Sequence, residues 1–303
     1  MQNESDHLVG GCRFYDRYPW LVGIFNQSIQ VLRPKQWIKN FLILAAPIAS
    51  TKLTEYYLQV ALGFVTFICA SSLGYIINDW VDRESDRLHK SKSLRPFASG
   101  TLGKTHFLVL FILLSAFTAM GALYLGRNFL LVVVMYLVVT FLYTLVIKNV
   151  PIVEMIWLAT GFLIRAVAGS ILVNTNPTGW FNITVFFSSL FIVACKRFSE
   201  KFNSERQGTR KVLEDYDQEV LSSIVNIAAS ATLLTYCLWV IQEHFNSYLA
   251  QISILPFVAF ILLYKNISKS ALAEAPEDVL LNNKPVLICA LISTILFGIV
   301  FYQ

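Results

Sequence analysis

Long apolar segments recur along the chain, and short polar or charged segments separate them. The apolar segments cover residues 37–50, 56–77, 107–125, 129–147, 152–173, 180–194, 221–241, 248–264 and 286–301. A helix needs roughly 20 apolar residues to cross a bilayer, so the first and sixth segments must recruit flanking residues. We therefore predict an all-α integral membrane protein with nine transmembrane helices.

The composition agrees with a membrane protein. Hydrophobic residues make up 56% of the 303 residues and charged residues only 14%, whereas a soluble domain carries roughly 25% charged residues. Residues 1–30 mix polar and aromatic positions and lack the apolar core of a secretory signal. We expect residues 1–30 to form a cytoplasmic tail and residues 31–303 to form one intramembrane domain.

Basic residues are distributed unevenly between alternate connecting segments. If the N-terminus is cytoplasmic, the outer segments contain only two of the 24 Lys and Arg residues, Lys52 and Arg127. This asymmetry follows the positive-inside rule. It predicts a multi-pass protein of the cell membrane whose charged loops, and the site they carry, face the cytoplasm. Because topology accounts for the net charge of +5, nucleic acid is not an expected partner.

An acidic cluster follows the second apolar segment. Asp79, Asp82 and Asp86 are spaced three and four residues apart, so on a helix they share one face. Such carboxylates repel one another unless a cation lies among them, and Mg²⁺ prefers hard oxygen ligands together with substrate phosphates. The alternative is a solvated helix face, on which Asp79 pairs with Arg83 and Asp86 pairs with Lys90.

Basic and aromatic side chains are expected at the same membrane face. On a helix, Lys35 and Lys39 would lie one turn apart and project from one face. Their alternative role is to anchor a helix end at the interface. Tyr143 and Lys148 flank a tight turn between two apolar segments, which is otherwise an ordinary connection ended by a proline.

Arg165 lies deep inside an apolar segment. A charge at that depth is costly and by default faces the interior of the bundle or a wet cavity, or it pairs with Glu154 on the same helix. Gly161 and Gly169 flank it and would let neighbouring helices approach closely.

The second long charged loop begins with Lys196, Arg197 and Glu200. One acidic cluster and one basic cluster suit a site that holds several phosphate groups, because Arg contacts phosphate through two donors and Lys acts as a point charge.

These motifs resemble a known family. The pattern Asn-Asp-x-x-Asp-x-x-x-Asp at residues 78–86 is similar to the first aspartate motif of the UbiA superfamily of intramembrane prenyltransferases. Further stretches resemble the decaprenyl-phosphate phosphoribosyltransferase branch of that superfamily and lie at residues 32–40, 95–100, 148–151, 161–169, 196–200 and 276–278. Asn149 and Glu154 depart from the pattern, where histidine and aspartate are expected.

The resemblance implies a Mg²⁺-dependent transfer of 5-phosphoribose from phosphoribosyl pyrophosphate to a polyprenyl phosphate. Asp79, Asp82 and Asp86 are the candidate metal ligands. The candidate catalytic residues are Asp79, Asp82, Lys196 and Arg197, and the candidate substrate-binding residues are Lys35, Lys39, Asn78, Arg83, Lys90, Arg95, Tyr143, Lys148, Arg165 and Glu200. Membrane lipids and a second copy of the chain are further partners that the sequence leaves open.

Two other functions stay open at this point. An aromatic prenyltransferase of the same superfamily would use a prenyl diphosphate, with a second acidic motif in the second loop. A transporter would place matched polar groups near the midplane of the membrane, whereas the charges here gather towards one face.

Overall fold

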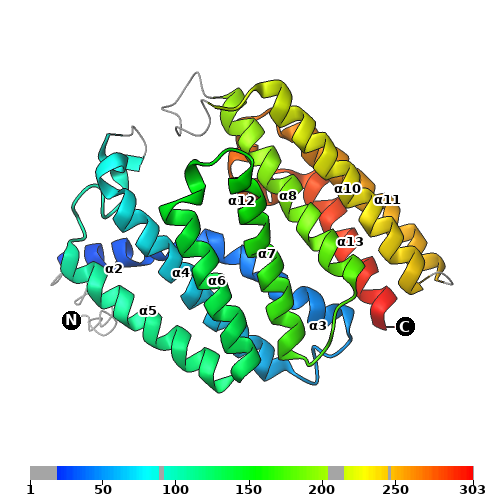
Figure 1. The fold of residues 1–303 in the computed structure, drawn as a ribbon, viewed down its shortest axis with the longest axis horizontal. Helices are drawn as coiled ribbons and strands as arrows, with labels where there is room; N and C mark the ends of the chain where they lie inside the picture. Colours follow the sequence, from blue (N-terminus) through cyan, green and yellow to red (C-terminus); the bar gives the residue numbers. More distant parts are fainter. Residues whose placement is uncertain (1–18, 89–91, 204–214, 245–246, 303) are drawn as a thin grey trace, which may run out of the picture.

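The computed structural model describes residues 19–88, 92–203, 215–244 and 247–302, and all of its regular elements are helical (Figure 1). The long helices are α4 (Tyr57–Arg87), α5 (Lys104–Tyr124), α6 (Arg127–Leu145), α7 (Val153–Leu172), α8 (Gly179–Phe202), α10 (Gln218–His244), α11 (Tyr248–Ile267) and α13 (Lys284–Tyr302). The shorter elements are α2 (Pro19–Leu32), η1 (Pro34–Leu44), α3 (Ala45–Ala49), η2 (Lys92–Leu94), η3 (Ile147–Asn149), η5 (Ala271–Glu274) and α12 (Pro276–Asn282).

The described helices support fewer spans than the nine expected. Seven of them, α4 to α8, α10 and α11, are long and apolar enough to cross a membrane, and α12 with α13 adds an eighth if that pair, bent by 95°, is one span. The expected first span, residues 37–50, instead forms the 3₁₀ helix η1 and the five-residue α3. Neither element has the length to cross a bilayer. The sixth apolar segment recruits its charged flank, as expected, and becomes the 24-residue α8.

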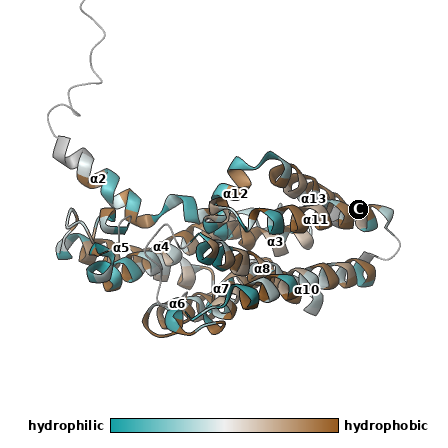
Figure 2. Cartoon of the chain, turned by 90° about the horizontal axis from the view of Figure 1, so that it is seen from above, coloured by the Kyte–Doolittle hydropathy of each residue, from teal (hydrophilic) through white to brown (hydrophobic). Residues whose placement is uncertain are grey.

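The long helices pack side by side as one bundle (Figure 1). In it α8 packs against α7 and α10, α4 against α5, and α11 against α13. Large apolar side chains point outward on several helices, with Ile112 62%, Leu131 57% and Leu255 70% exposed. Hydrophobic residues dominate the helical ribbon in Figure 2, whereas hydrophilic residues mark the connection into α12. An apolar exterior of this extent fits a lipid environment.

One of the two glycines on α7 allows a close approach between elements. A Cβ added at Gly169 would lie 2.0 Å from the carbonyl oxygen of Ile43, so η1 packs directly on the backbone of α7. A Cβ at Gly161 would meet only Nη1 of Arg165, at 3.8 Å. The expected close helix approach is therefore confirmed at Gly169 and is wrong at Gly161.

The N-terminal part of the described chain is also helical. The helix α2 begins at Pro19, inside the segment expected to be a tail, and packs against α4. Val31 is 1% exposed and belongs to an apolar cluster with Leu73 and Ile76 of α4. Residues 1–18 lie outside the described residues, so the expected division at residue 30 stays a prediction.

Candidate active site

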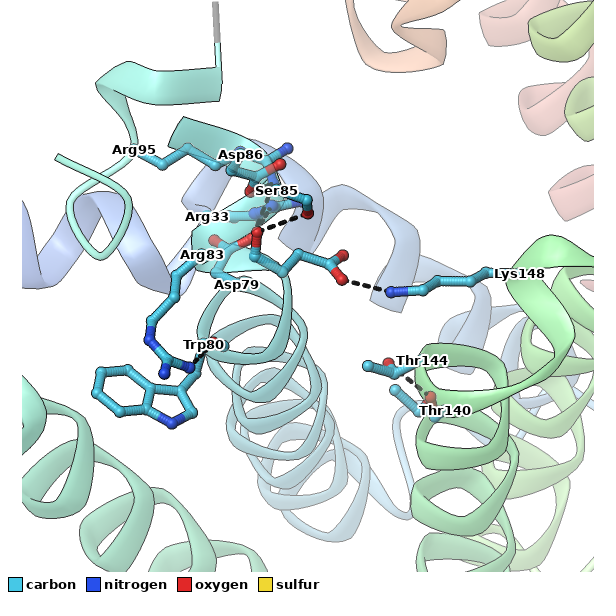
Figure 3. A network of polar contacts seen from close by, with 11 residues as sticks. Arg33, Asp79, Trp80, Arg83, Ser85, Asp86, Arg95, Thr140, Thr144 and Lys148 are labelled. Carbon is cyan, nitrogen blue, oxygen red and sulfur yellow. Dashed lines mark hydrogen bonds and ion pairs between the residues drawn. The ribbon is translucent and has the colours of Figure 1, made fainter. Parts of the chain in front are cut away.

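The acidic cluster of α4 meets basic residues from three other segments (Figure 3). Asp79 is 3% exposed, and its Oδ1 accepts hydrogen bonds from Nη2 of Arg33 at 2.5 Å and from Nη1 of Arg95 at 3.1 Å. Arg95 also donates to Oδ2 of Asp86 at 2.7 Å. Two aspartates that lie two turns apart on α4 are thus joined by one guanidinium group, and a second guanidinium group reaches Asp79 from the start of η1.

Asp82 has a different partner. Its carboxylate binds Nζ of Lys148, which lies in η3 between α6 and α7. Arg83 points away from the acidic cluster in Figure 3, because its guanidinium group lies 4.4 Å from the ring centroid of Trp80 and donates to that residue's carbonyl oxygen. The local pair between Asp79 and Arg83, expected for a solvated helix face, is therefore not formed.

Lys90, the partner expected for Asp86 on a solvated helix face, lies outside the described residues. Asp86 is 5% exposed and has a long-range partner in Arg95, so it is not a solvated side chain. Asn78 lies beside Asp79 on α4 and is half-buried. On this face, Asp79 and Asp86 are thus buried, whereas Asp82 is half-buried.

The backbone is strained where Arg33 enters the site. Arg33 has φ 53° and ψ 63°, a left-handed conformation that non-glycine residues rarely adopt. Its guanidinium group also lies 5.2 Å from the ring centroid of Tyr75. Strain of this kind persists where surrounding contacts hold a residue in place, and it is frequent at functional sites.

The donor chemistry of the α4 carboxylates fits a magnesium ion. Asp79, Asp82 and Asp86 supply hard oxygen ligands, and each of them already binds a positive charge. Within the described residues, no three His, Cys, Asp or Glu side chains gather closely enough to hold a metal ion without help. Mg²⁺ is usually held by one or two carboxylates together with substrate phosphates, so this arrangement matches a metal that arrives with its substrate.

A second ionic cluster lies between α7 and α8. Arg197 is 1% exposed and Glu154 is fully buried. Arg197 donates to both carboxylate oxygens of Glu154 and, through Nη1, to Glu200 at 2.6 Å. The hydroxyl of Tyr143 lies 3.3 Å from Nη2 of Arg197 and 3.3 Å from Oε2 of Glu154. Nζ of Lys196, which is less buried, lies 3.9 Å from Glu200.

This arrangement separates the roles of the two neighbouring basic residues. The guanidinium group of Arg197 is surrounded by protein partners, which favours a role in positioning Glu200 and Tyr143. Lys196 has a side chain that is 31% exposed and is the better placed of the two to meet a ligand. The expected phosphate contacts of both residues stay predictions.

Arg165 faces the interior of the bundle, as expected, but it does not pair with Glu154. Its three nitrogens donate to Oδ1 of Asn40 at 2.9 Å, to the carbonyl oxygen of Gly161 at 2.8 Å and to the hydroxyl of Tyr136 at 2.7 Å. The guanidinium group thus ties η1 and α6 to α7. Because Arg197 takes both oxygens of Glu154, that carboxylate is already engaged.

The residues of η1 follow a three-residue period, which separates two lysines expected on one face. In a 3₁₀ helix, side chains at i and i+3 eclipse, whereas those at i and i+4 diverge. Lys35 is therefore 77% exposed beside Asp278, at 3.7 Å. Lys39 is half-buried, with its Nζ 6.0 Å from the ring centroid of Phe162. The expectation that both lysines project from one face is wrong.

Lys39 lies in an electrostatically unusual position. Burial lowers the pKa of its ammonium group to about 8, Glu277 opposes this shift, and the guanidinium groups of Arg165, Arg33 and Arg197 add to it. The charge of Lys39 is therefore influenced electrostatically by residues of α7, α8 and α12, which lie at the same end of the bundle as η1.

Sequence reasoning missed several residues of this region. Arg33, Gln36, Asn40, Tyr136 and Glu277 were not among the candidate residues. Three of them lie in the stretch of residues 32–40, whose resemblance to the family was already a signal for the whole segment. Tyr136 gave no such signal, because its pairing with Arg165 depends on how α6 packs against α7.

The sequence of the chain also matches known proteins. The sequence profile of the UbiA prenyltransferase family matches residues 41–284. A protein of Mycobacterium tuberculosis named decaprenyl-phosphate phosphoribosyltransferase is 34% identical over 273 residues, which cover 87% of this chain and 90% of that protein. A protein of the same name from Corynebacterium glutamicum is 33% identical over 87% of this chain and 83% of its own length.

The fold also matches solved structures. The structure of a UbiA homolog from Archaeoglobus fulgidus bound to GPP and Mg²⁺ superimposes with a TM-score of 0.68 and covers 91% of this chain and 100% of its own. The two sequences are 17% identical. At this identity, the likeness establishes a shared architecture of the helices.

Proposed function

The chain belongs to the UbiA prenyltransferase family, and from this premise we propose that it transfers 5-phosphoribose from phosphoribosyl pyrophosphate to a polyprenyl phosphate and releases diphosphate. The name shared by relatives that match nearly its whole length supports this choice of substrates. The observation in the structure that supports it most is the concentration of cations around the α4 carboxylates. Arg33, Arg95 and Lys148 all reach that cluster. Lys39 lies on η1, which packs against α4, and Lys196 lies on α8 beside Arg197.

The proposed reaction exchanges one oxygen for another at C1 of the ribose. The bond between C1 and the diphosphate oxygen breaks, and its electron pair leaves with the diphosphate. An oxygen of the polyprenyl phosphate forms the new bond to C1. Because the acceptor phosphate is already an anion at neutral pH, the site needs no strong general base. Positioning and electrostatic stabilisation are therefore the main demands on the protein.

Different residues would hold the metal ion and bind the phosphate groups. Asp79, Asp82 and Asp86 are the residues that would hold Mg²⁺, which would offset the charge of the leaving diphosphate. Arg33 and Arg95 have the fork geometry that binds phosphate oxygens in pairs. Their present partners are carboxylates, which present the same kind of paired oxygens.

The remaining cations suit the other phosphates. Lys39, Lys148 and Lys196 provide single charges for the 5-phosphate of the donor and the phosphate of the acceptor. Arg197 acts through Glu154, Glu200 and Tyr143, which it holds in place. The apolar exterior of the bundle lets the polyprenyl tail remain in the membrane while its phosphate reaches the ionic end.

An assay of the purified protein tests this function. The protein, reconstituted with Mg²⁺ and a polyprenyl phosphate, receives either labelled phosphoribosyl pyrophosphate or a labelled prenyl diphosphate with an aromatic acceptor. We expect labelled lipid only from the first donor. Use of the prenyl diphosphate alone would contradict the proposal and establish the aromatic prenyltransferase alternative. The transporter alternative is disfavoured, because the family's members are transferases and the charges gather at one end of the bundle.

The lowered pKa of Lys39 predicts a pH dependence. The ammonium group is charged below a pH of about 8 and neutral above it. If its charge helps bind phosphate, kcat/KM should fall as the pH rises through about 8. Lys39→Arg should move this fall to higher pH, because arginine stays protonated. An unchanged alkaline limb in Lys39→Arg would show that another group controls it, and Lys35→Arg is the matched control on the exposed side of η1.

The charge asymmetry predicts which end of the bundle faces the cytoplasm. In intact cells, with the native cysteines replaced, a membrane-impermeant thiol reagent should label Asn128→Cys and should not label Ser99→Cys. Both positions are exposed and lie at opposite ends of α5 and its connections. Permeabilised cells should show labelling at both positions. Outside labelling at residue 99 would invert the proposed orientation and move the active site to the other face.

A further inference from the structure

The turn between α6 and α7 has an unfavourable backbone conformation. Ile152, the residue just before α7, has φ 65° and ψ −50°. The N–H of Val153 donates to the carbonyl oxygen of Pro151 at 2.7 Å, so residues 151–153 form a γ-turn of the rare kind with positive φ. A positive φ is a genuine outlier for a β-branched residue such as isoleucine. The surrounding structure must therefore hold this turn in place.

A buried tyrosine from the second charged loop binds this turn. The hydroxyl of Tyr216 accepts a hydrogen bond from the N–H of Ile152 at 2.5 Å. An N–H just before a helix has no partner within that helix. Tyr216 is 4% exposed and belongs to an apolar cluster with Met155 of α7 and Phe198 of α8. The core of the bundle therefore fixes the phenol that holds the turn.

The turn lies between residues of the two ionic clusters. Lys148, shortly before the turn, binds the carboxylate of Asp82 (Figure 3). Glu154, shortly after it, binds Arg197 through both carboxylate oxygens. A change of φ at Ile152 would rotate the chain on one side of the turn relative to the other. The conformation of this one residue therefore determines how Lys148 and Glu154 are placed relative to each other.

We propose that Tyr216 is a positioning residue for the transfer reaction. Its hydroxyl holds the strained turn at Ile152, and the turn directs Lys148 towards Asp82. This inference rests on the proposed function and adds to it a residue, outside both ionic clusters, on which their relative placement depends. Glycine adopts a positive φ without strain, so a glycine at position 152 would form the turn with less help from the phenol. This difference separates a positioning role from a packing role.

The test measures kcat and KM for phosphoribosyl pyrophosphate in the reconstituted full-length protein, with rates expressed per folded protein. Tyr216→Phe keeps the buried ring and removes only the hydroxyl. We expect it to lower kcat/KM by about tenfold, as for the loss of one buried hydrogen bond. Ile152→Gly should keep most of the activity, because the isoleucine is 45% exposed. The double variant Tyr216→Phe/Ile152→Gly should recover most of the activity that Tyr216→Phe loses.

Tyr264→Phe is the matched control. Tyr264 belongs to the same apolar cluster, and its hydroxyl has no hydrogen-bond partner among the described residues, so we expect normal kcat/KM. If the unaltered protein does not use phosphoribosyl pyrophosphate, the proposed function and this inference both fall. If it uses that donor and Tyr216→Phe is fully active, this inference alone is overturned. An equal loss from Tyr216→Phe with isoleucine or glycine at position 152 would also overturn it, since the phenol would then not act through the turn.

Discussion

Asp79→Asn is expected to lower turnover on the order of 10²–10³-fold, in the range seen when a single electrostatic group is removed from an active site. The substitution preserves the shape of the side chain but removes the charge that Arg33 and Arg95 share. It also removes a proposed ligand of Mg²⁺. The measurement is turnover with phosphoribosyl pyrophosphate over a range of Mg²⁺ concentrations.

Further variants and removal of the metal accompany this measurement. Glu84→Gln lies on the same helix, and because its side chain is 63% exposed, we expect near-normal turnover. Asp86→Asn should have a milder effect than Asp79→Asn, since Asp86 contacts Arg95 but not Arg33. Activity that survives EDTA, or that survives in the Asp79→Asn/Asp82→Asn double variant, would contradict the metal-binding role.

Arg197→Met is expected to destabilise the protein by about 3–5 kcal/mol, because it leaves the charge of Glu154 buried without its partner. Glu154→Met should destabilise the protein to a similar degree, because it leaves the buried charge of Arg197 without Glu154 as its partner. The double variant Glu154→Met/Arg197→Met should regain much of the stability, since apolar residues of similar volume often replace a buried ion pair without loss. Thermal unfolding of the purified protein in lipid nanodiscs measures this effect.

The same variants separate folding from function. Arg197 positions Glu200 and Tyr143, so the double variant should be stable and still turn over substrate poorly. Stable and fully active protein would show that the cluster serves folding alone. A double variant as unstable as either single one would indicate that the geometry of the ion pair, rather than the unpaired charge, holds α7 against α8.

The interior position of Arg165 and the need for positive charge beside the α4 aspartates could be predicted from the sequence, because both follow from a direct physical cost. A charge within an apolar helix must face the interior, and Arg165 does. Aspartates crowded on one helix face need positive charge, and Arg33, Arg95 and Lys148 supply it. These conclusions required no knowledge of how the helices pack.

The partners of these residues could not be predicted, because they depend on tertiary packing. Local spacing favoured a pair between Asp79 and Arg83, yet Asp79 bonds to Arg33, 46 residues away, and Arg83 lies on Trp80. The segment at residues 37–50 was assigned an α-helical period, which a short apolar run cannot distinguish from a 3₁₀ period. That error misplaced Lys35, and it also concealed the neighbourhood of Gln36, Lys39 and Glu277.

The long 3₁₀ helix also determines which changes of chain length the protein can tolerate. Successive residues of η1 turn by about 120°, so Gln36 and Lys39 lie along one edge while Trp37, Asn40 and Ile43 lie along another. Inserting or deleting one residue between Pro34 and Leu44 would move every following side chain to the next edge. If the change lies before Lys39, the side chain of Lys39 would turn onto an edge of η1 that packs on α4 or α7. Natural variation in this segment should therefore consist of substitutions, with its length held constant.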